Sequence, residues 1–237
     1  MNYFLDTNVE LGFVFCTDPW NEESVAVFNK EDMLYYSNSV DDEFYKLYNQ
    51  FLNQQKFFFR ELKRILALEK STKQINCDTL KLKSWQLQLH HDFEQNKKDK
   101  CIEVFWKFCK RISKSEGSLD EIHFKIRDII QYISRFLQVF ERVIFNRKLE
   151  FENKVIYYDE RTYDYKDIFD KLVSVGVHNP DTFIILDAHD LALEDGIVLE
   201  FVTADNIMIQ NVNQISNYLS IHEFHYLKNF KPCRINS

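Results

Sequence analysis

The sequence predicts an α/β fold with a central, mostly parallel sheet that an α-helical insertion interrupts. Strand-like apolar runs alternate with helical segments in residues 1–50 and 151–237, an order typical of parallel sheets. Residues 51–150 carry apolar stripes at helical spacing almost throughout, which predicts the insertion. The chain of 237 residues has only 4 glycines and 3 prolines, too few for the many turns of an all-β sandwich or barrel.

The first part of the chain is expected to form a strand, a helix and a second strand. The run Asn2–Leu5 ends at Asp6, and Met33–Ser37 is a second short run of apolar and aromatic residues. A further helix should begin near Ser39, because Asp41–Glu43 place acids in a first turn, where the helix dipole favours them.

Three apolar stripes predict three or four packed helices in residues 51–150. Segments that would end a helix are sparse and fall at Asn76–Asp78, Gln95–Lys100 and Ser113–Ser118. At helical spacing, aromatic residues are more often part of the core than of the surface. We therefore expect the rings of Phe58, Phe105 and Trp106 to be buried.

The third part returns to alternating strands and helices. Gly196 ends a helix that a turn at Asn179-Pro180 begins, and Val198–Thr203 follows as a strand before Asp205. The remaining predicted elements are a strand at Val155–Tyr158, a helix at Asp164–Ser174 and a last short strand at Tyr218–Ile221.

Composition excludes several classes of protein. Hydrophobic residues make up 45% of the chain and aromatic residues 16%, which suits a substantial core and argues against disorder. No apolar stretch approaches about 18 residues, and Asp6 places a charge near the N-terminus, so we expect a cytoplasmic protein without membrane span or signal peptide. The cysteines are odd in number and widely spaced, which predicts reduced structural thiols. They are Cys16, Cys77, Cys101, Cys109 and Cys233.

Charge is distributed unevenly along the chain. The formal net charge is -7, yet residues 51–150 hold 21 lysines and arginines against 13 acids, and the remaining residues hold 9 against 24. Cations interleaved with aromatic residues suit phosphate binding and base stacking. An ordinary solvated helix surface explains the cations equally well. The candidate RNA-binding residues are Arg60, Lys63, Arg64, Lys107, Lys110 and Arg111.

Four acidic residues occupy positions that a parallel sheet would bring together. Asp6 ends the first strand and Asp205 follows the strand at Val198–Thr203, while Glu43 and Asp187 lie on adjoining helices. Ligands of open parallel sheets bind beyond the carboxyl ends of the strands. Clustered carboxylates need a countercharge, and hard oxygen ligands select Mg²⁺ or Mn²⁺. Taken singly, each acid also fits a solvated or helix-capping role.

Four short blocks of sequence surround these acids. They are Phe4-Leu5-Asp6-Thr7-Asn8-Val9, Ser39-Val40-Asp41-Asp42-Glu43, Asp187-Ala188 leading into Leu191-Ala192, and Phe201-Val202-Thr203-Ala204-Asp205. Their order, and the eighteen-residue step from Asp187 to Asp205, resemble the signature blocks of the PIN-domain nucleases, a family that includes toxin nucleases of the VapC type. The resemblance covers residues 1–50 and 155–225, and the first and last blocks are the most specific.

The resemblance implies a Rossmann-like PIN domain with the activity of a metal-dependent ribonuclease. Its catalytic and metal-holding residues would be Asp6, Glu43, Asp187 and Asp205. Hydrogen bonds from Thr7 or Asn8 and from Thr203 would orient these ligands, and Asp190 would assist or replace Asp187. Small toxins of the family lack a helical insertion of about 100 residues, so this chain departs from that group.

Three functional hypotheses follow. The first is an endoribonuclease that hydrolyses phosphodiester bonds at a Mg²⁺ or Mn²⁺ site. The second is a non-catalytic PIN-like module that binds RNA or a protein through the insertion. The third is a toxin-type nuclease controlled by an antitoxin. DNA as an alternative substrate and a homodimer both stay open, since the metal chemistry is indifferent to the sugar and no 2′-hydroxyl contact is identified.

Overall fold

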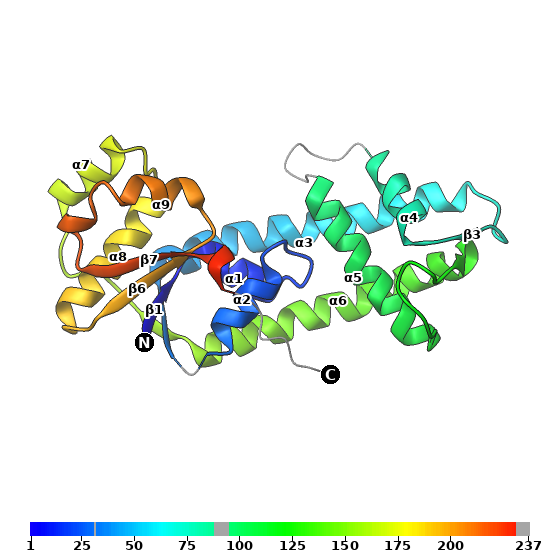
Figure 1. Cartoon of the computed structure of the whole chain (residues 1–237), viewed down its shortest axis with the longest axis horizontal. Helices are drawn as coiled ribbons and strands as arrows, with labels where there is room; N and C mark the ends of the chain where they lie inside the picture. Colours follow the sequence, from blue (N-terminus) through cyan, green and yellow to red (C-terminus); the bar gives the residue numbers. More distant parts are fainter. Residues whose placement is uncertain (31, 88–94, 231–237) are drawn as a thin grey trace. The chain divides into compact units, whose positions relative to one another are not determined.

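The computed structural model describes residues 1–30, 32–87 and 95–230, and it divides the chain into two compact units (Figure 1). The sheet unit comprises Met1–Phe15, Trp20–Tyr48 and Arg147–Ser237. The helical unit comprises Cys16–Pro19 and Asn49–Asn146. The short segment Cys16–Pro19, which the sequence analysis placed in the first α/β part, thus belongs to the helical unit.

The sheet unit is built on a five-stranded parallel sheet, which confirms the predicted α/β class and is consistent with a Rossmann-like fold. The strand order is β5-β2-β1-β6-β7, so the first strand of the chain lies at the centre. The strands are β1 (Asn2–Leu5), β2 (Met33–Ser37), β5 (Ile156–Tyr158), β6 (Leu199–Thr203) and β7 (Ile221–Tyr226).

Burial of both faces explains why the central strands are continuous apolar runs. Phe4 and Leu5 of β1 and Phe201 and Val202 of β6 are all fully buried. Phe4 lies opposite Phe201 in the parallel register, and their rings stack with centroids 5.9 Å apart. This packing fixes where β1 and β6 end, and therefore where the polar residues that follow them lie.

Helices follow β1, β2 and β6 with at most two residues in between. Two acids act as helix N-caps there, Asp6 for α1 (Thr7–Val14) and Asp205 for α9 (Asn206–Val212). Helix α8 (Asp181–Glu194) contacts β2, β6 and β7. The other helices of this unit are α2 (Asn21–Phe28) and α7 (Lys166–Ser174), with short 3₁₀ turns at Ser216–Tyr218 and Leu227–Asn229.

The helical unit has a core of aromatic rings. Phe59, Phe105 and Phe136 contact one another with ring centroids 4.9 to 5.6 Å apart. Phe58 and Trp106 are fully buried, as is Phe105, so the prediction that these three rings belong to the core is confirmed. The helices are α4 (Cys77–Trp85), α5 (Gln95–Ser113) and parts of α3 (Asn38–Ala67) and α6 (Ile126–Lys154); β3 (Gln74–Ile75) pairs with β4 (Phe124–Lys125).

Two predicted boundaries are wrong. The expected break at Gln95–Lys100 is instead the first turn and a half of α5, because a run of polar residues at a helix start looks like a loop in sequence. The expected strand Tyr218–Ile221 lies instead at Ile221–Tyr226, after the 3₁₀ turn at Ser216–Tyr218. This edge strand contains exposed His222 and Glu223, so its apolar pattern is weak.

The described cysteines are free thiols, and Cys233 lies outside the described residues. Burial raises the pKa of Cys77 to about 11 and raises the pKa of Cys101 and Cys109 still further above the usual range. These thiols are therefore protonated at neutral pH and unreactive as nucleophiles. Within the described ranges, the structure contains no helix that combines the length and the apolar character needed to cross a membrane.

Candidate metal centre

Three carboxylates from three distant segments of the chain meet at the carboxyl end of the parallel sheet. Asp6 follows β1, Glu43 lies in the first turns of α3 after β2, and Asp181 is the first residue of α8. One oxygen atom from each lies within 4.8 Å of the others, and the group could hold a metal ion. Carboxylate oxygens at this spacing are the ligands that hard divalent cations take.

Asp6 is the most enclosed member of the group. Its side chain is fully buried and accepts hydrogen bonds from the Thr7 N–H at 2.8 Å, the Thr203 hydroxyl at 2.6 Å and the Asn8 amide at 3.2 Å. Burial, with a smaller contribution from the charge of Glu43, raises the pKa of Asp6 to about 6, although the three hydrogen bonds act in the opposite direction. The hydrogen bonds therefore hold the Asp6 carboxylate in one orientation, but ionisation of this buried group costs free energy.

Thr7 joins the first two acids through its backbone N–H and its side-chain hydroxyl. Its N–H donates to Asp6, and its hydroxyl donates to a carboxylate oxygen of Glu43 at 2.6 Å. A single residue at the start of α1 thus fixes both carboxylates. Hydrogen bonds of this kind, made by residues just behind the ligands, orient the ligands of metal sites.

Asp181 differs from its neighbours because, among the described residues, its carboxylate has no hydrogen-bond donor. Burial, together with smaller contributions from the negative charges of Asp6, Glu43 and Asp205, raises its pKa to about 7. The side chain is half-buried and adjoins three other acids, and no described residue supplies a compensating cation. Such an arrangement favours either a bound proton or a bound cation.

Asp205 is close enough to raise the pKa of Asp181, but its carboxylate already caps α9. It accepts hydrogen bonds from the N–H groups of Ile207 at 2.7 Å and Met208 at 3.0 Å. The Thr203 hydroxyl that donates to Asp6 also accepts the Asp205 N–H at 2.9 Å. The Thr203 hydroxyl therefore connects the Asp6 carboxylate to the backbone of Asp205.

Asp187, the expected third acid, is not a member of the three-carboxylate group. It accepts the Ser37 hydroxyl at 2.5 Å and pairs with Arg161 at 3.3 Å. Asp181 lies six residues earlier on the same helix, which is about 9 Å along the axis and roughly a third of a turn around it. The available signal was the acid next to Asn179-Pro180, where the helix was predicted to begin.

Asp190 also lies outside that group and anchors a nearby loop instead. It accepts hydrogen bonds from the hydroxyls of Tyr158 and Tyr165 and, at 2.6 Å, from the Thr162 N–H. Burial opposes its ionisation, but these hydrogen bonds outweigh burial and lower the pKa of Asp190. A stabilised, fully partnered carboxylate is a structural group rather than a free ligand.

The six predicted RNA-binding cations differ in how the fold uses them. Lys63 donates to the Ser134 hydroxyl, Arg64 pairs with Glu61, and Lys110 donates to the Gly117 carbonyl. Such contacts leave these side chains less available for a ligand. The other three, Arg60, Lys107 and Arg111, are exposed and have no partner among the described residues.

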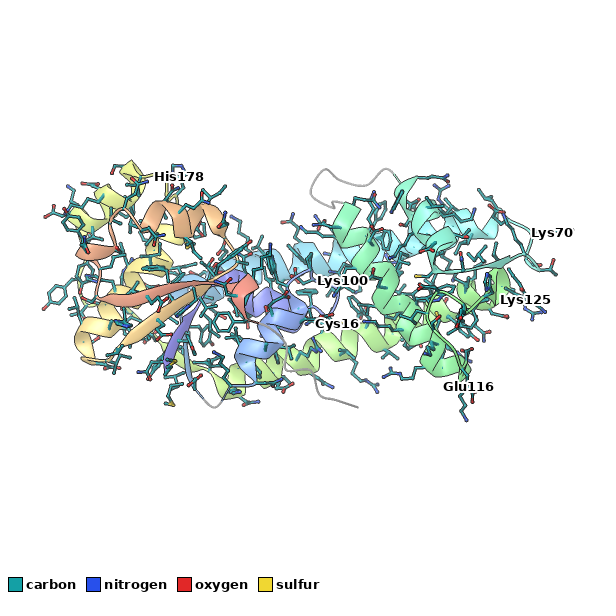
Figure 2. All side chains as sticks on the ribbon, viewed as in Figure 1. Cys16, Lys70, Lys100, Glu116, Lys125 and His178 are labelled. Atoms are coloured by element: carbon teal, nitrogen blue, oxygen red, sulfur yellow. The ribbon has the colours of Figure 1, made fainter. Side chains whose placement is uncertain are left out.

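Lys107 and Arg111 line two adjoining cavities of the helical unit. One, of about 460 Å³, is also lined by Lys110, Lys114, Ser115 and Leu119 and has no acidic residue. The other, of about 310 Å³, is mainly apolar and includes Cys16, which is labelled in Figure 2. Lys107 and Arg111 are four residues apart and share one face of α5, and Lys114 follows directly after the helix ends. Lys114 was not among the six predicted residues.

The chain has no match among protein-family models, curated proteins or solved structures.

Proposed function

We propose that this protein is a metal-dependent endoribonuclease with the architecture of the PIN-domain nucleases. The ligands of its Mg²⁺ or Mn²⁺ would be Asp6, Glu43 and Asp181, with Asp205 beside them. A divalent ion in such a site polarises the phosphodiester, activates water and stabilises the charge that develops on the attacked phosphate. RNA is the proposed substrate because the sequence blocks resemble those of a ribonuclease family.

The observation that supports this proposal best is the convergence of carboxylates at the carboxyl end of adjacent parallel strands. Four acids lie near one another there, and the pKa values of Asp6 and Asp181 are raised to about 6 and about 7. Buried like charges destabilise a fold, and groups with such perturbed pKa values cluster at functional sites. A divalent cation bound there would offset the mutual repulsion of the carboxylates.

The chain's own residues would orient the ligands. Thr7 holds Asp6 and Glu43 through its N–H and hydroxyl, and Thr203 holds Asp6 against the start of α9. Asp181, which lacks a donor in the described structure, keeps its oxygen atoms available for a cation. The site therefore combines two fixed carboxylates with one whose lone pairs are free.

Cleavage of a labelled RNA of mixed sequence, and of the matching DNA, tests the proposal. We expect the wild type to cut RNA with Mn²⁺ or Mg²⁺ but not with chelator, and Asp181→Asn to lose at least about a hundredfold in rate. Asp195→Asn is the matched control, because Asp195 is exposed at the other end of α8. Equal cleavage by wild type and Asp181→Asn would contradict the proposal.

A second candidate function is a non-catalytic RNA-binding module. It is favoured by the cavity of about 460 Å³ that Lys107, Lys110, Arg111 and Lys114 line without any acid. Phosphate binding by these cations requires no metal, and it weakens steeply with salt. RNA affinity that depends on salt, in a protein that cuts neither RNA nor DNA, would favour this function over the nuclease.

A further inference from the structure

A cavity of about 420 Å³ adjoins the carboxylate cluster within the sheet unit. Its walls come from the start of α3 and from the turn that leads into α8, and Glu43 belongs both to the wall and to the cluster. The volume lies in the range of about 300 to 1,000 Å³ that is typical of small-ligand pockets. The lining residues are Ser39, Asp42, Glu43, Lys46, Leu47, Asn179, Pro180 and Phe183.

The lining separates into regions of different chemistry. Leu47, Pro180 and Phe183 supply an apolar wall, and Phe183 presents a half-buried aromatic ring. Lys46 and Asn179 supply hydrogen-bond donors, and both side chains are exposed. A pocket of mostly apolar wall with a few convergent polar groups, next to perturbed carboxyl groups, is the general form of a substrate site.

Lys46 has no ion pair or hydrogen bond among the described residues. Asp42 lies one helical turn before it and lines the same cavity, yet the two side chains are not paired. Several other lysines of the sheet unit are engaged: Lys148 contacts Glu152 and Tyr45, and Lys154 donates to the Phe28 carbonyl. Lys46 is the only cation that lines this cavity in the described structure.

A phosphodiester that approaches the cluster meets the negative charge of Glu43 and its neighbours. An unpaired ammonium group one turn along α3 from Glu43 offsets that repulsion and binds a phosphate oxygen directly. The apolar wall then accepts the flat face of a base, which stacks on aromatic and aliphatic side chains without regard to sequence. Only an unpaired base can enter a cavity of this size, so the site suits single strands.

We propose that this cavity binds one nucleotide of single-stranded RNA beside the cleaved bond, with Lys46 on its phosphate and Leu47, Pro180 and Phe183 against its base. This inference rests on the nuclease function proposed above. It makes Lys46 a substrate-binding residue, and it assigns the ligand class to single-stranded phosphodiesters. Because Lys46 is exposed and unpaired, its replacement should leave the fold intact.

The test compares Lys46→Ala and Lys46→Arg with Lys228→Ala, which removes another exposed lysine of the sheet unit. The affinity of each protein for a short fluorescein-labelled single-stranded RNA is measured in chelator by anisotropy. KM and kcat for cleavage of the same RNA are measured with Mn²⁺. We expect Lys46→Ala to weaken binding and raise KM by about five- to tenfold with little change in kcat. Lys46→Arg should retain affinity within about twofold, since it keeps the charge.

The two proposals fail in different ways. If Asp181→Asn abolishes cleavage while Lys46→Ala matches Lys228→Ala in affinity and KM, the nucleotide site is wrong and the nuclease stands. If the wild type does not cleave, yet Lys46→Ala still weakens RNA binding, the nucleotide site stands and the nuclease is wrong. A duplex of the same sequence that binds as tightly as the single strand would overturn the assignment of an unpaired base.

Discussion

Asp181→Asn should stabilise the metal-free protein at about pH 8 while it weakens Mn²⁺ binding at least about tenfold. Asp181 lies beside three acids and, among the described residues, accepts no hydrogen bond, so the substitution removes repulsion without breaking a contact. A carboxyl pKa moved from 3.8 to about 7 corresponds to a cost of up to about 4 kcal/mol when the group is ionised. Because the side chain is only half-buried, solvent screening reduces the expected gain to about 2 kcal/mol.

The sign of the pH dependence follows from the raised pKa of Asp181. Below pH about 4 the carboxyl group is protonated in both the folded and the unfolded chain, so it has no effect on stability. Between about pH 4 and 7 the unfolded chain loses the proton first, and the stability of the metal-free wild type falls as the pH rises. Asp181→Asn should lack this loss, so the two proteins should differ at about pH 8 and converge at about pH 4.

Urea unfolding in chelator at these two pH values measures the difference in the free energy of unfolding. At a Mn²⁺ concentration that saturates only the wild type, the wild type should become the more stable protein, because the bound ion stabilises it. Asp195→Asn serves as control and should follow the wild type under all conditions. If Asp181→Asn in chelator is no more stable than the wild type at about pH 8, the electrostatic account of the cluster is wrong.

Three further predictions concern the proposed metal ligands, Thr203, and the cations Lys107 and Arg111 of α5. Mn²⁺ affinity, measured by calorimetry, should increase from about pH 5 to about pH 7 and then level off. The reason is that the ion displaces protons from Asp6 and Asp181, whose pKa values are raised to about 6 and about 7. A Mn²⁺ affinity independent of pH would contradict this prediction. Thr203→Val should weaken Mn²⁺ binding about tenfold and lower the free energy of unfolding by about 1 to 2 kcal/mol, since buried Asp6 loses its 2.6 Å hydrogen bond. Mn²⁺ titration measures the first effect, and urea unfolding measures the second. Lys107→Glu combined with Arg111→Glu should weaken RNA binding at least about tenfold and flatten its salt dependence, with an unchanged circular dichroism spectrum; an unaltered salt slope would exclude these residues from the RNA contact.

The central strands could be predicted because buried parallel strands are the simplest pattern in a sequence. Residues 2–5 and 33–37 are apolar runs that polar residues end, and the structure has β1 and β2 at these positions. The last strand could not be placed in the same way. It lies at the sheet edge, where exposed His222 and Glu223 replace the apolar pattern by which strands are recognised.

The sequence likewise allows some residues of the candidate site to be predicted but not others. Asp6 and Glu43 were singled out from their positions after strands, and the structure brings their carboxylates together. Asp181 was missed because hydrophobic periodicity gives the face of a helix but not which turn reaches the edge of the sheet. Asp187 lies on a buried stretch of the same helix, where Ser37 and Arg161 satisfy it.

The roles of the cations could not be read from composition. Lysine and arginine reach over long distances, and their contacts depend on neighbours that only the fold provides. Lys63 donates to Ser134, which is 71 residues away in the sequence, and Lys110 donates to the Gly117 carbonyl in the loop after α5. Lys46 has no partner in the described structure. Lys46 and the turn before α8 line one cavity, although more than 130 residues separate them in the sequence, so only the fold brings them together.

Titration of Mn²⁺ into the metal-free protein, followed by electron paramagnetic resonance of the free ion, tests the central claim most directly. The carboxylate cluster predicts saturable binding by the wild type that Asp6→Asn and Asp181→Asn each weaken at least about tenfold. Asp195→Asn should bind Mn²⁺ as the wild type does. Equal Mn²⁺ affinity in all four proteins would show that the cluster does not hold the ion and would contradict the account.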